Sequence, residues 1–239
     1  MKRFAVIMGA SGAIGEAIAN QLASDGWSLY LHWNSTPVNG LAEELSRNFT
    51  KQEFIAVQAD FTCTDGAERL ATQVYDAACI VVASGHALQK MLIDTEDAEM
   101  EALWNVHVKN PISAIRRISP YFHRYPATYV VFISSIWGEI GAALETVYSS
   151  VKGAQLAFVK AYAKEMAASG TRVNAISPGF IQTKMNGNLT EEELAMIQDE
   201  IPLGLGLPHH VADAVDFLVN GKADYMTGQV LRINGGWHL

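Results

Sequence analysis

Residues 4–15, which read FAVIMGASGAIG, decide the fold of this chain. The apolar run over 4–8 is typical of a buried strand, and apolar residues then recur at helical spacing from Ile14 to Leu22. A glycine-rich turn between a strand and a helix lets the backbone approach a phosphate, and the helix N-terminus supplies free N–H groups for it. We therefore predict a dinucleotide-binding loop here; a turn that only connects a strand to a helix is the alternative.

The rest of the chain repeats this alternation of short apolar runs and longer helical patterns. Further strands are predicted at 27–33, 54–59, 79–83, 129–133, 173–176 and 230–233. Further helices are predicted at 41–49, 65–75, 96–120, 147–168, 190–199 and 209–219. Strands that are apolar on both faces and alternate with helices imply a parallel sheet covered on each side. No linker or repeat divides the 239 residues, so we expect one α/β domain over 1–239.

Composition excludes several classes of function. The formal net charge of −8 argues against nucleic-acid binding, which needs a basic face, and against attraction to anionic membranes. Cys63 and Cys79 have no metal-ligand spacing and form no disulfide framework, so no metal site is expected. The apolar run at the start of the chain is too short for a signal peptide or a membrane span. We expect a soluble, cytoplasmic protein.

Several polar or glycine-containing segments follow predicted strands. They are the glycine loop, Asp60, the turn at 83–85, Ser135 and Pro178-Gly179. In an open parallel sheet, ligands bind at the carboxyl ends of the strands, so these segments are expected to share one crevice. The Asp60 carboxylate could accept a hydrogen bond from an adenine amino group; capping of the helix at 65–75 is the alternative.

The segment YSSVK, residues 148–152, places Tyr148 and Lys152 one helical turn apart, so both side chains project from the same face. The predicted helix follows the strand that ends at Ser135. A lysine ammonium close to a phenol lowers the pKa of the phenol. A hydroxyl, a phenol and an ammonium together suit proton donation to a carbonyl oxygen while a hydride arrives from a nicotinamide. An incidental Tyr–Lys pair on a helix is the alternative.

Together these motifs resemble the short-chain dehydrogenase/reductase family over nearly the whole chain. The matching segments are GASGAIG at 9–15, Asp60, SS at 134–135, YSSVK at 148–152, RVNAISPG at 172–179 and TGQVLRINGG at 227–236. The last two, with IPLG at 201–204, resemble the 3-oxoacyl-acyl-carrier-protein reductase branch. The resemblance implies a single Rossmann-type domain with a doubly wound, seven-stranded parallel sheet and helices on both faces. It also implies a nicotinamide cofactor and a homotetramer, or else a homodimer.

Carried over by position, the resemblance makes Tyr148 the proton donor and Ser135 the hydrogen-bond donor to the substrate carbonyl. Lys152 would hold the nicotinamide ribose and lower the pKa of Tyr148. The catalytic asparagine of the family aligns with His107, twenty-eight residues before Ser135. A histidine satisfied by a backbone carbonyl is one interpretation of His107. We predict the other, a catalytic proton relay that reaches Lys152 through a water.

The resemblance also predicts the cofactor-binding residues. They are Gly9, Ser11, Gly12, Ala13, Ile14, Gly15, Asn34, Ser35, Asp60, Phe61, Ala83, Gly85, Tyr148, Lys152, Pro178, Gly179, Ile181 and Thr183. An NAD-specific site carries an acidic residue at the end of the second strand, where this chain has His32. No carboxylate there repels a 2′-phosphate, and Asn34 and Ser35 can donate to one. NADPH is therefore favoured, with NAD not excluded.

The predicted substrate residues are Trp137, Glu139, Leu144 and Met185, each of which could instead be a packing residue. The leading interpretation is an NADPH-dependent ketone reductase most like 3-oxoacyl-acyl-carrier-protein reductase. The segments SSIWGE, YSSVKGAQ and NGGWH also resemble the elongation factor P 5-aminopentanone reductases of Gram-positive bacteria, which reduce a ketone on a modified lysine of a protein. A cationic amine on such a substrate could suit Glu139. A dinucleotide-binding regulator without catalysis is the alternative from another class, against which the intact Ser135, Tyr148 and Lys152 argue.

Overall fold

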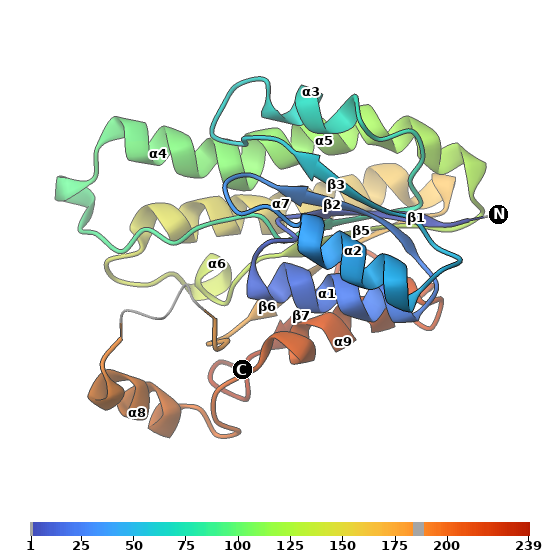
Figure 1. Cartoon of the computed structure of the whole chain (residues 1–239). Helices are drawn as coiled ribbons and strands as arrows, with labels where there is room; N and C mark the ends of the chain where they lie inside the picture. Colours follow the sequence, from blue (N-terminus) through green and yellow to red (C-terminus); the bar gives the residue numbers. More distant parts are fainter. Residues whose placement is uncertain (1, 184–188) are drawn as a thin grey trace.

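The computed structural model describes residues 2–183 and 189–239. Its centre is a seven-stranded sheet in the order β3-β2-β1-β4-β5-β6-β7, with every neighbouring pair parallel (Figure 1). The strands are β1 (Phe4–Met8), β2 (Ser28–Trp33), β3 (Phe54–Gln58), β4 (Cys79–Val82), β5 (Thr128–Ile133), β6 (Thr171–Pro178) and β7 (Val230–Ile233). All seven predicted strands are confirmed, with ends shifted by one or two residues.

Helices cover both faces of this sheet, as the doubly wound fold requires (Figure 1). One face carries α1 (Ala13–Ser24), α2 (Asn39–Asn48) and α9 (Pro208–Val219). The other carries α3 (Gly66–Ala71), α4 (Asp97–Trp104), α5 (Asn110–Ile118) and α7 (Thr146–Met166). Two more helices, α6 (Trp137–Ile140) and α8 (Glu191–Glu200), lie at the carboxyl end of the strands.

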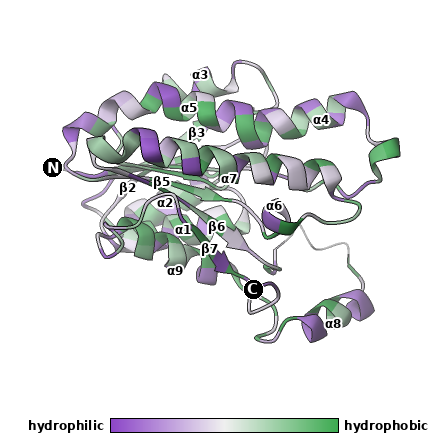
Figure 2. Ribbon diagram, turned by 180° about the vertical axis from the view of Figure 1, so that it is seen from behind, coloured by the Kyte–Doolittle hydropathy of each residue, from purple (hydrophilic) through white to green (hydrophobic). Residues whose placement is uncertain are grey.

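The buried strands divide the apolar side chains between two cores. In β1, alternate residues point to opposite faces because a strand has a two-residue period. Ala5 and Ile7 therefore join the core under α1 and α9, while Val6 and Met8 join the core under α5 and α7. The helices turn apolar sides inward and hydrophilic sides outward (Figure 2). Among the described residues, no helix is both long and apolar enough to cross a lipid bilayer.

The strand order creates a crevice at one end of the sheet. From β1 the chain crosses to β2 on one side, whereas β4 lies on the other side of β1. The connections that follow β1 and β4 therefore run to opposite faces of the sheet and separate at its carboxyl edge. Ligands bind at such a switch point in open α/β sheets.

The prediction of one continuous helix over 96–120 is wrong in one respect. The structure has two α-helices there, α4 and α5, and the π-helical turn η2 (Asn105–Lys109) separates them. The N–H of Asn110 donates to the carbonyl of Asn105, five residues earlier. Pro111 has no N–H to offer the carbonyl of His107, four residues before it. The Gln155 side chain on α7 donates to that carbonyl instead, at 2.7 Å.

Asn110 begins α5 and ties it to the loop between β3 and α3. Its side-chain nitrogen donates to the carbonyls of Phe61 and Cys63 at 2.7 and 2.9 Å, and its oxygen accepts from the N–H of Ala67 at 3.0 Å. The Asn110 side chain is buried, so no water can replace these partners without rearrangement. The loop that carries Asp60 is thereby held at the carboxyl edge of the sheet.

We expect Asn110→Ala to lower the free energy of unfolding by about 2–4 kcal/mol, because three buried backbone groups lose their partner. Urea denaturation of the cofactor-free protein measures this change. Asn105→Ala is the matched control, since the Asn105 amide makes one exposed hydrogen bond, to the carbonyl of Thr62. Equal stability of the two variants would contradict the bridging role of Asn110.

Candidate active site

The glycine loop lies where the structure leaves no room for side chains. Gly9 has a φ of +87°, and a Cβ on it would lie 2.7 Å from the backbone of Ser84. A Cβ on Gly15 would lie 2.1 Å from the carbonyl oxygen of Gly9. Ala13, which stands where the family has glycine, begins α1 and needs no positive φ. The loop therefore packs against the β4 turn and leaves the first N–H groups of α1 at the crevice.

His32 supports this loop from below. Its Nδ1 accepts from the N–H of Gly9 at 3.1 Å, and its Nε2 donates to the carbonyl of Ala59 at 2.9 Å. The ring also stacks on Phe61, with 4.3 Å between ring centroids. Burial lowers the pKa of His32 to about 4, so the ring is neutral and joins β1, β2 and β3. This structural role was missed from the sequence, because both partners come from other strands.

Asn34 and Asp60 meet at the outer end of the crevice, at 3.2 Å between the Asn34 Nδ2 and the Asp60 Oδ1. The same oxygen of Asp60 accepts from the N–H and the hydroxyl of Thr62, at 2.8 and 2.7 Å. Partial burial acts to raise the pKa of Asp60, but these hydrogen bonds outweigh it and the pKa is lowered. Asp60 is therefore an anion in a tight turn. Ser35 is exposed beside it.

Ser135, Tyr148 and Lys152 converge at the middle of the carboxyl edge. The hydroxyl oxygen of Ser135, just beyond β5, accepts from the N–H of Trp137 at 3.2 Å. The Ser135 side chain also forms a hydrogen bond that acts to lower the pKa of Tyr148. The Lys152 Nζ lies 5.6 Å from the centroid of the Tyr148 ring and donates to the carbonyl of Ile133 at 2.9 Å. The three residues predicted to be catalytic are thus neighbours.

The electrostatics of this cluster differ from the expectation that Lys152 lowers the pKa of Tyr148. Burial raises the pKa of Tyr148, and the charge of Glu145 raises it further. Burial also lowers the pKa of Lys152 to about 7, so its ammonium is only partly populated at neutral pH. Burial therefore favours the neutral form of both groups.

His107 lies against the catalytic tyrosine. Its ring meets the Tyr148 ring edge-on, with 5.6 Å between centroids, and its Nε2 lies 2.9 Å from the carbonyl oxygen of His86. The N–H of His86 also lies 3.2 Å from this Nε2, so the tautomer of the ring decides which of the two contacts is a hydrogen bond. The buried Nδ1 has no hydrogen-bond partner among residues 2–183 and 189–239. Burial, and then the charge of Lys152, hold the pKa of His107 well below its usual value. A Cβ on Gly85 would lie 2.3 Å from this ring, so glycine is needed there.

Four further predicted cofactor residues lie at the end of β6 and in the segment that follows it: Pro178, Gly179, Ile181 and Thr183. Pro178 ends β6, and the N–H of Gly179 donates to the carbonyl of Ile233 at 3.0 Å. A Cβ on Gly179 would lie 2.8 Å from Asn234. Ile181 is buried, and Thr183 is the last described residue before position 189.

The predicted substrate residues have different surroundings. Trp137 packs edge-to-face on Trp237, with 5.2 Å between centroids. The Glu139 carboxylate is bound by Arg232, at 2.8 Å, so its charge is already neutralised. Leu144 is exposed and has a φ of +65°. Met185 lies outside the described residues.

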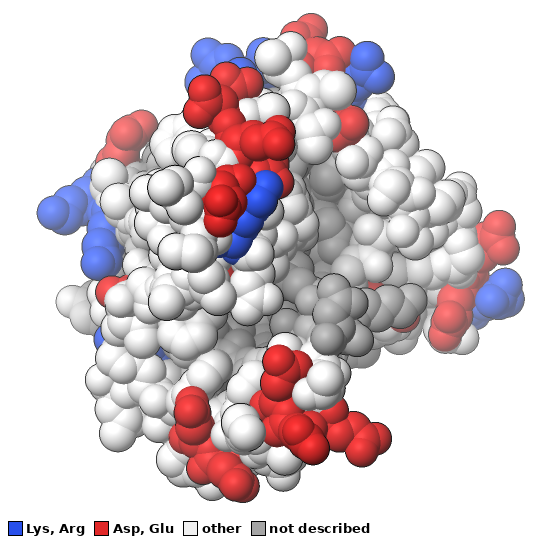
Figure 3. All heavy atoms as spheres, turned by 90° about the vertical axis from the view of Figure 1, so that its left-hand side faces the viewer, with Lys and Arg blue, Asp and Glu red and all other residues white. Residues whose placement is uncertain are grey.

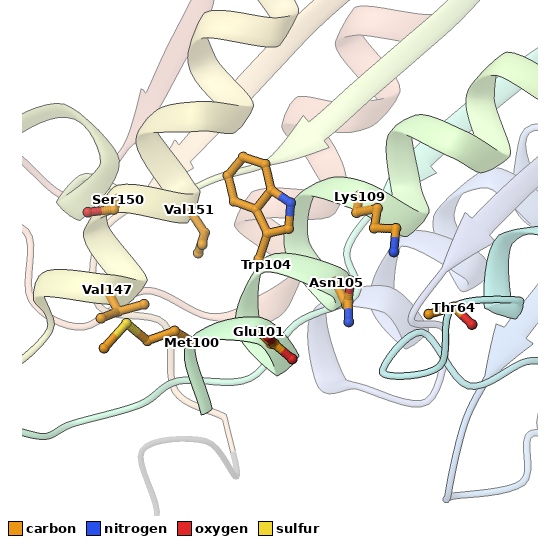
Figure 4. Close-up of a pocket in the computed structure, with 9 residues that line it drawn as sticks. All are labelled: Thr64, Met100, Glu101, Trp104, Asn105, Lys109, Val147, Ser150 and Val151. Atoms are coloured by element: carbon orange, nitrogen blue, oxygen red, sulfur yellow. The ribbon is translucent and has the colours of Figure 1, made fainter. Parts of the chain in front are cut away.

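A separate hollow of about 610 Å³ lies on the outside of α4 and α7 (Figure 4). Its lining residues are Thr64, Met100, Glu101, Trp104, Asn105, Lys109, Val147, Ser150 and Val151. Val147 and Val151 each precede a catalytic residue on α7 by one position, and a helix turns about 100° per residue. The hollow is therefore distinct from the crevice that holds Tyr148 and Lys152.

Comparisons with known proteins agree with this geometry. The family model described as Enoyl-(Acyl carrier protein) reductase matches residues 9–238. The chain is 43% identical to a protein named uncharacterized oxidoreductase YmfI of Bacillus subtilis (strain 168), over 100% of both chains. It is 27% identical to 3-oxoacyl-[acyl-carrier-protein] reductase FabG of Staphylococcus epidermidis (strain ATCC 35984), again over 100% of both chains.

A solved structure of a short-chain dehydrogenase/reductase from Brucella melitensis, titled glucose/ribitol dehydrogenase, superposes with a TM-score of 0.89. It is 26% identical to this chain and covers 100% of both chains. The sheet order, the glycine loop and the matches over the whole length agree. The chain belongs to the short-chain dehydrogenase/reductase family and is an NAD(P)H-dependent oxidoreductase.

Proposed function

We propose that the protein reduces a ketone to an alcohol with NADPH. The observation that carries this proposal is the convergence of Ser135, Tyr148 and Lys152 beside the glycine loop, at the carboxyl edge of the sheet. A hydroxyl and a phenol that both reach one point can bind and protonate a carbonyl oxygen.

The residues present fit a dinucleotide. The positions of Gly9 and Gly15 exclude any Cβ, which leaves backbone N–H groups to face a pyrophosphate at the start of α1. Lys152 would hold the nicotinamide ribose, and Asp60 the adenine end. A bound nicotinamide supplies the hydride for the reaction.

The chain's own residues then orient the substrate and supply the proton. The Ser135 hydroxyl accepts from the N–H of Trp137 and is hydrogen-bonded to Tyr148, so the two hydroxyls meet where a substrate oxygen would bind. The Tyr148 hydroxyl donates the proton that completes the alcohol. The buried Nδ1 of His107 has no hydrogen-bond partner among the described residues, and its ring packs against the tyrosine, which supports a role for His107 in the relay that returns a proton to Tyr148.

The preference for NADPH is supported by the end of β2. Asn34 and Ser35 follow this strand, and both can donate to a 2′-phosphate. The nearest acid, Asp60, already accepts hydrogen bonds from Asn34 and Thr62. The repulsion that excludes a 2′-phosphate from NAD-specific sites is thereby weakened.

Two carbonyl substrates remain candidates. The likeness to FabG favours a 3-oxoacyl group on an acyl carrier protein. A 5-aminopentanone group on elongation factor P is favoured by the charge of the entrance, because an acidic carrier protein requires a basic patch. The carboxyl edge of the sheet instead displays mostly acidic side chains above and below the crevice (Figure 3). The expectation that Glu139 binds the amine loses support, since Arg232 already holds that carboxylate.

The test is a screen of NADPH oxidation by the purified protein with acetoacetyl thioesters and small aminoketones side by side. We expect at least one ketone to be reduced, and Tyr148→Phe to lower its turnover by about a hundredfold or more, because the general acid is lost. Calorimetric titration should show tighter binding of NADPH than of NADH by both proteins. Loss of the reaction with every ketone, or tighter NADH binding, would overturn the respective part of the proposal.

A second prediction concerns His107. We expect His107→Ala to lower turnover by about tenfold or more, because the imidazole that packs against Tyr148 and serves the proton relay is removed. The dissociation constant for NADPH should stay within about threefold of the wild-type value, since His107 only borders the cofactor crevice. His107→Asn restores the family residue and serves as the matched control, with partial recovery expected. Unchanged turnover in His107→Ala would leave His107 as a packing residue.

We also propose that copies of the chain associate through the hollow on α4 and α7, as homodimers or as part of a homotetramer. Trp104 is 48% exposed at its centre, and Val147 and Met100 add apolar surface. Glu101 and Lys109 flank this surface with opposite charges, so a two-fold related copy would pair each acid with a base.

Trp104→Glu should convert the assembly to monomers, because a charge would be buried in a desolvated apolar contact. Sedimentation equilibrium measures the mass, and Tyr225→Glu, a change of an exposed aromatic residue elsewhere, is the matched control. A wild-type protein that is already monomeric would refute the interface.

A further inference from the structure

Glu145 is the N-cap residue of α7 and Tyr148 is the third residue of that helix, two positions whose side chains are neighbours at a helix start. Its backbone is fixed on both sides. The Glu145 N–H donates to the carbonyl of Ala142 at 3.3 Å, and its carbonyl accepts from the N–H of Ser149 at 2.7 Å. The backbone of Glu145 is thereby fixed at the start of α7, close enough for its charge to act on Tyr148.

This carboxylate has no positive partner in the part of the chain that the structure describes. No ion pair and no side-chain hydrogen bond reaches it from residues 2–183 or 189–239. The pKa of Glu145 is raised, and burial is the cause. Burial also acts to raise the pKa of Glu139, but hydrogen bonds and the charge of Arg232 outweigh it, so the pKa of Glu139 is lowered. A half-buried acid without a partner is destabilising, which indicates that its partner arrives from outside.

The ammonium groups of the two lysines near this loop, Lys90 and Lys152, already have partners. The backbone N–H of Lys90 donates to the carbonyl of Leu144 at 2.6 Å, while its ammonium pairs with Glu99 at 2.9 Å. Lys152 donates to the carbonyl of Ile133. Neither ammonium is free to neutralise Glu145.

The backbone just before Glu145 is strained. Leu144 has a φ of +65°, the only positive φ outside glycine among the described residues. A residue with a Cβ is disfavoured in this left-handed region, and such strain is retained where the surroundings require it. The hydrogen bond from Lys90 holds Leu144 in this conformation, and the turn sets the direction in which the next residue leaves the loop.

The side chains around the entrance to the crevice are mostly acidic, so the electrostatic potential there is negative, like the charge of Glu145. Figure 3 shows the carboxyl edge of the sheet. Acidic side chains lie below the crevice, where α8 is, and acidic side chains together with fewer basic ones lie above it. The first turn of α8 carries Glu191, Glu192 and Glu193, and the start of α4 carries Asp97 and Glu99. Such a field attracts cations toward the crevice and disfavours anions.

We propose that Glu145 binds a cationic group, such as a protonated amine, on the ketone that Tyr148 protonates, and so selects substrates by charge. The inference rests on the proposed ketone reductase activity. It assigns the selectivity to a residue that the sequence motifs do not mark, in place of Glu139.

The assignment also couples recognition to the chemistry. While Glu145 is unpaired, its charge opposes ionisation of Tyr148 and makes the phenol a weaker acid. Burial is the larger cause of the raised pKa of Tyr148, and a bound ammonium offsets the part that Glu145 adds. A cationic substrate therefore strengthens the acid that protonates its carbonyl oxygen.

The test uses two linear ketones of equal length, one ending in a primary amine and the other in a hydroxyl group. The quantity measured is the ratio of their kcat/KM values, amine over hydroxyl. We expect a ratio of about tenfold or more in the wild-type protein, and a fall toward unity in Glu145→Gln. Tyr148 donates its proton to both ketones, so an effect of the substitution on the tyrosine that both substrates share cancels in the ratio.

Glu145→Asp keeps the charge and should retain most of the preference, while Glu44→Gln removes an exposed acid on α2 and should not change it. NADPH titration of each variant verifies that the crevice is intact. Reduction of neither ketone, nor of any thioester, would overturn the proposed activity itself. Equal reduction of both ketones by the wild-type protein, or a ratio that persists in Glu145→Gln, would overturn only the role of Glu145.

Discussion

The hydrogen bond from Gln155 to the carbonyl of His107 joins the two helical segments that build the catalytic site. Pro111 cannot serve that carbonyl, and the chain around it takes a π-helical turn. The turn brings the His107 ring against Tyr148, while Gln155 lies on α7, the helix that carries Tyr148 and Lys152. The position of the proton donor thus depends on one buried side chain that replaces a missing helical bond.

Burial governs the chemistry of this site. Lys152 and His107 are buried and Tyr148 is partly buried, and burial shifts the pKa of each group so that its neutral form is favoured. Of the three, Lys152 has a pKa near neutrality, about 7, while Tyr148 and His107 are held in their neutral forms. A cofactor and a substrate then decide which group carries charge during a turnover.

Two acidic residues near the crevice differ in their partners. Glu139 forms an ion pair with Arg232, which lies ninety-three residues later in the chain, so its carboxylate has a structural role. Glu145 is matched by nothing in the described chain, and it is therefore available to a ligand. The acidic surroundings shown in Figure 3 extend this difference to the entrance and favour substrates that bring positive charge.

The sequence by itself determined the strands, the parallel sheet, the glycine loop and the cluster of Ser135, Tyr148 and Lys152. The strands, the sheet and the glycine loop follow from local periods and turns, and the Tyr148–Lys152 pair follows from spacing within one helix. Ser135 joins this pair because it follows a strand whose carboxyl end meets the same edge of the sheet, and because it matches the family motif. Only the tertiary structure decided that His32 is a support for the loop, that the long helix contains a π turn, and that Glu145 rather than Glu139 is unpaired. Those features depend on which distant atoms satisfy a buried polar group, and local spacing carries no information about such partners.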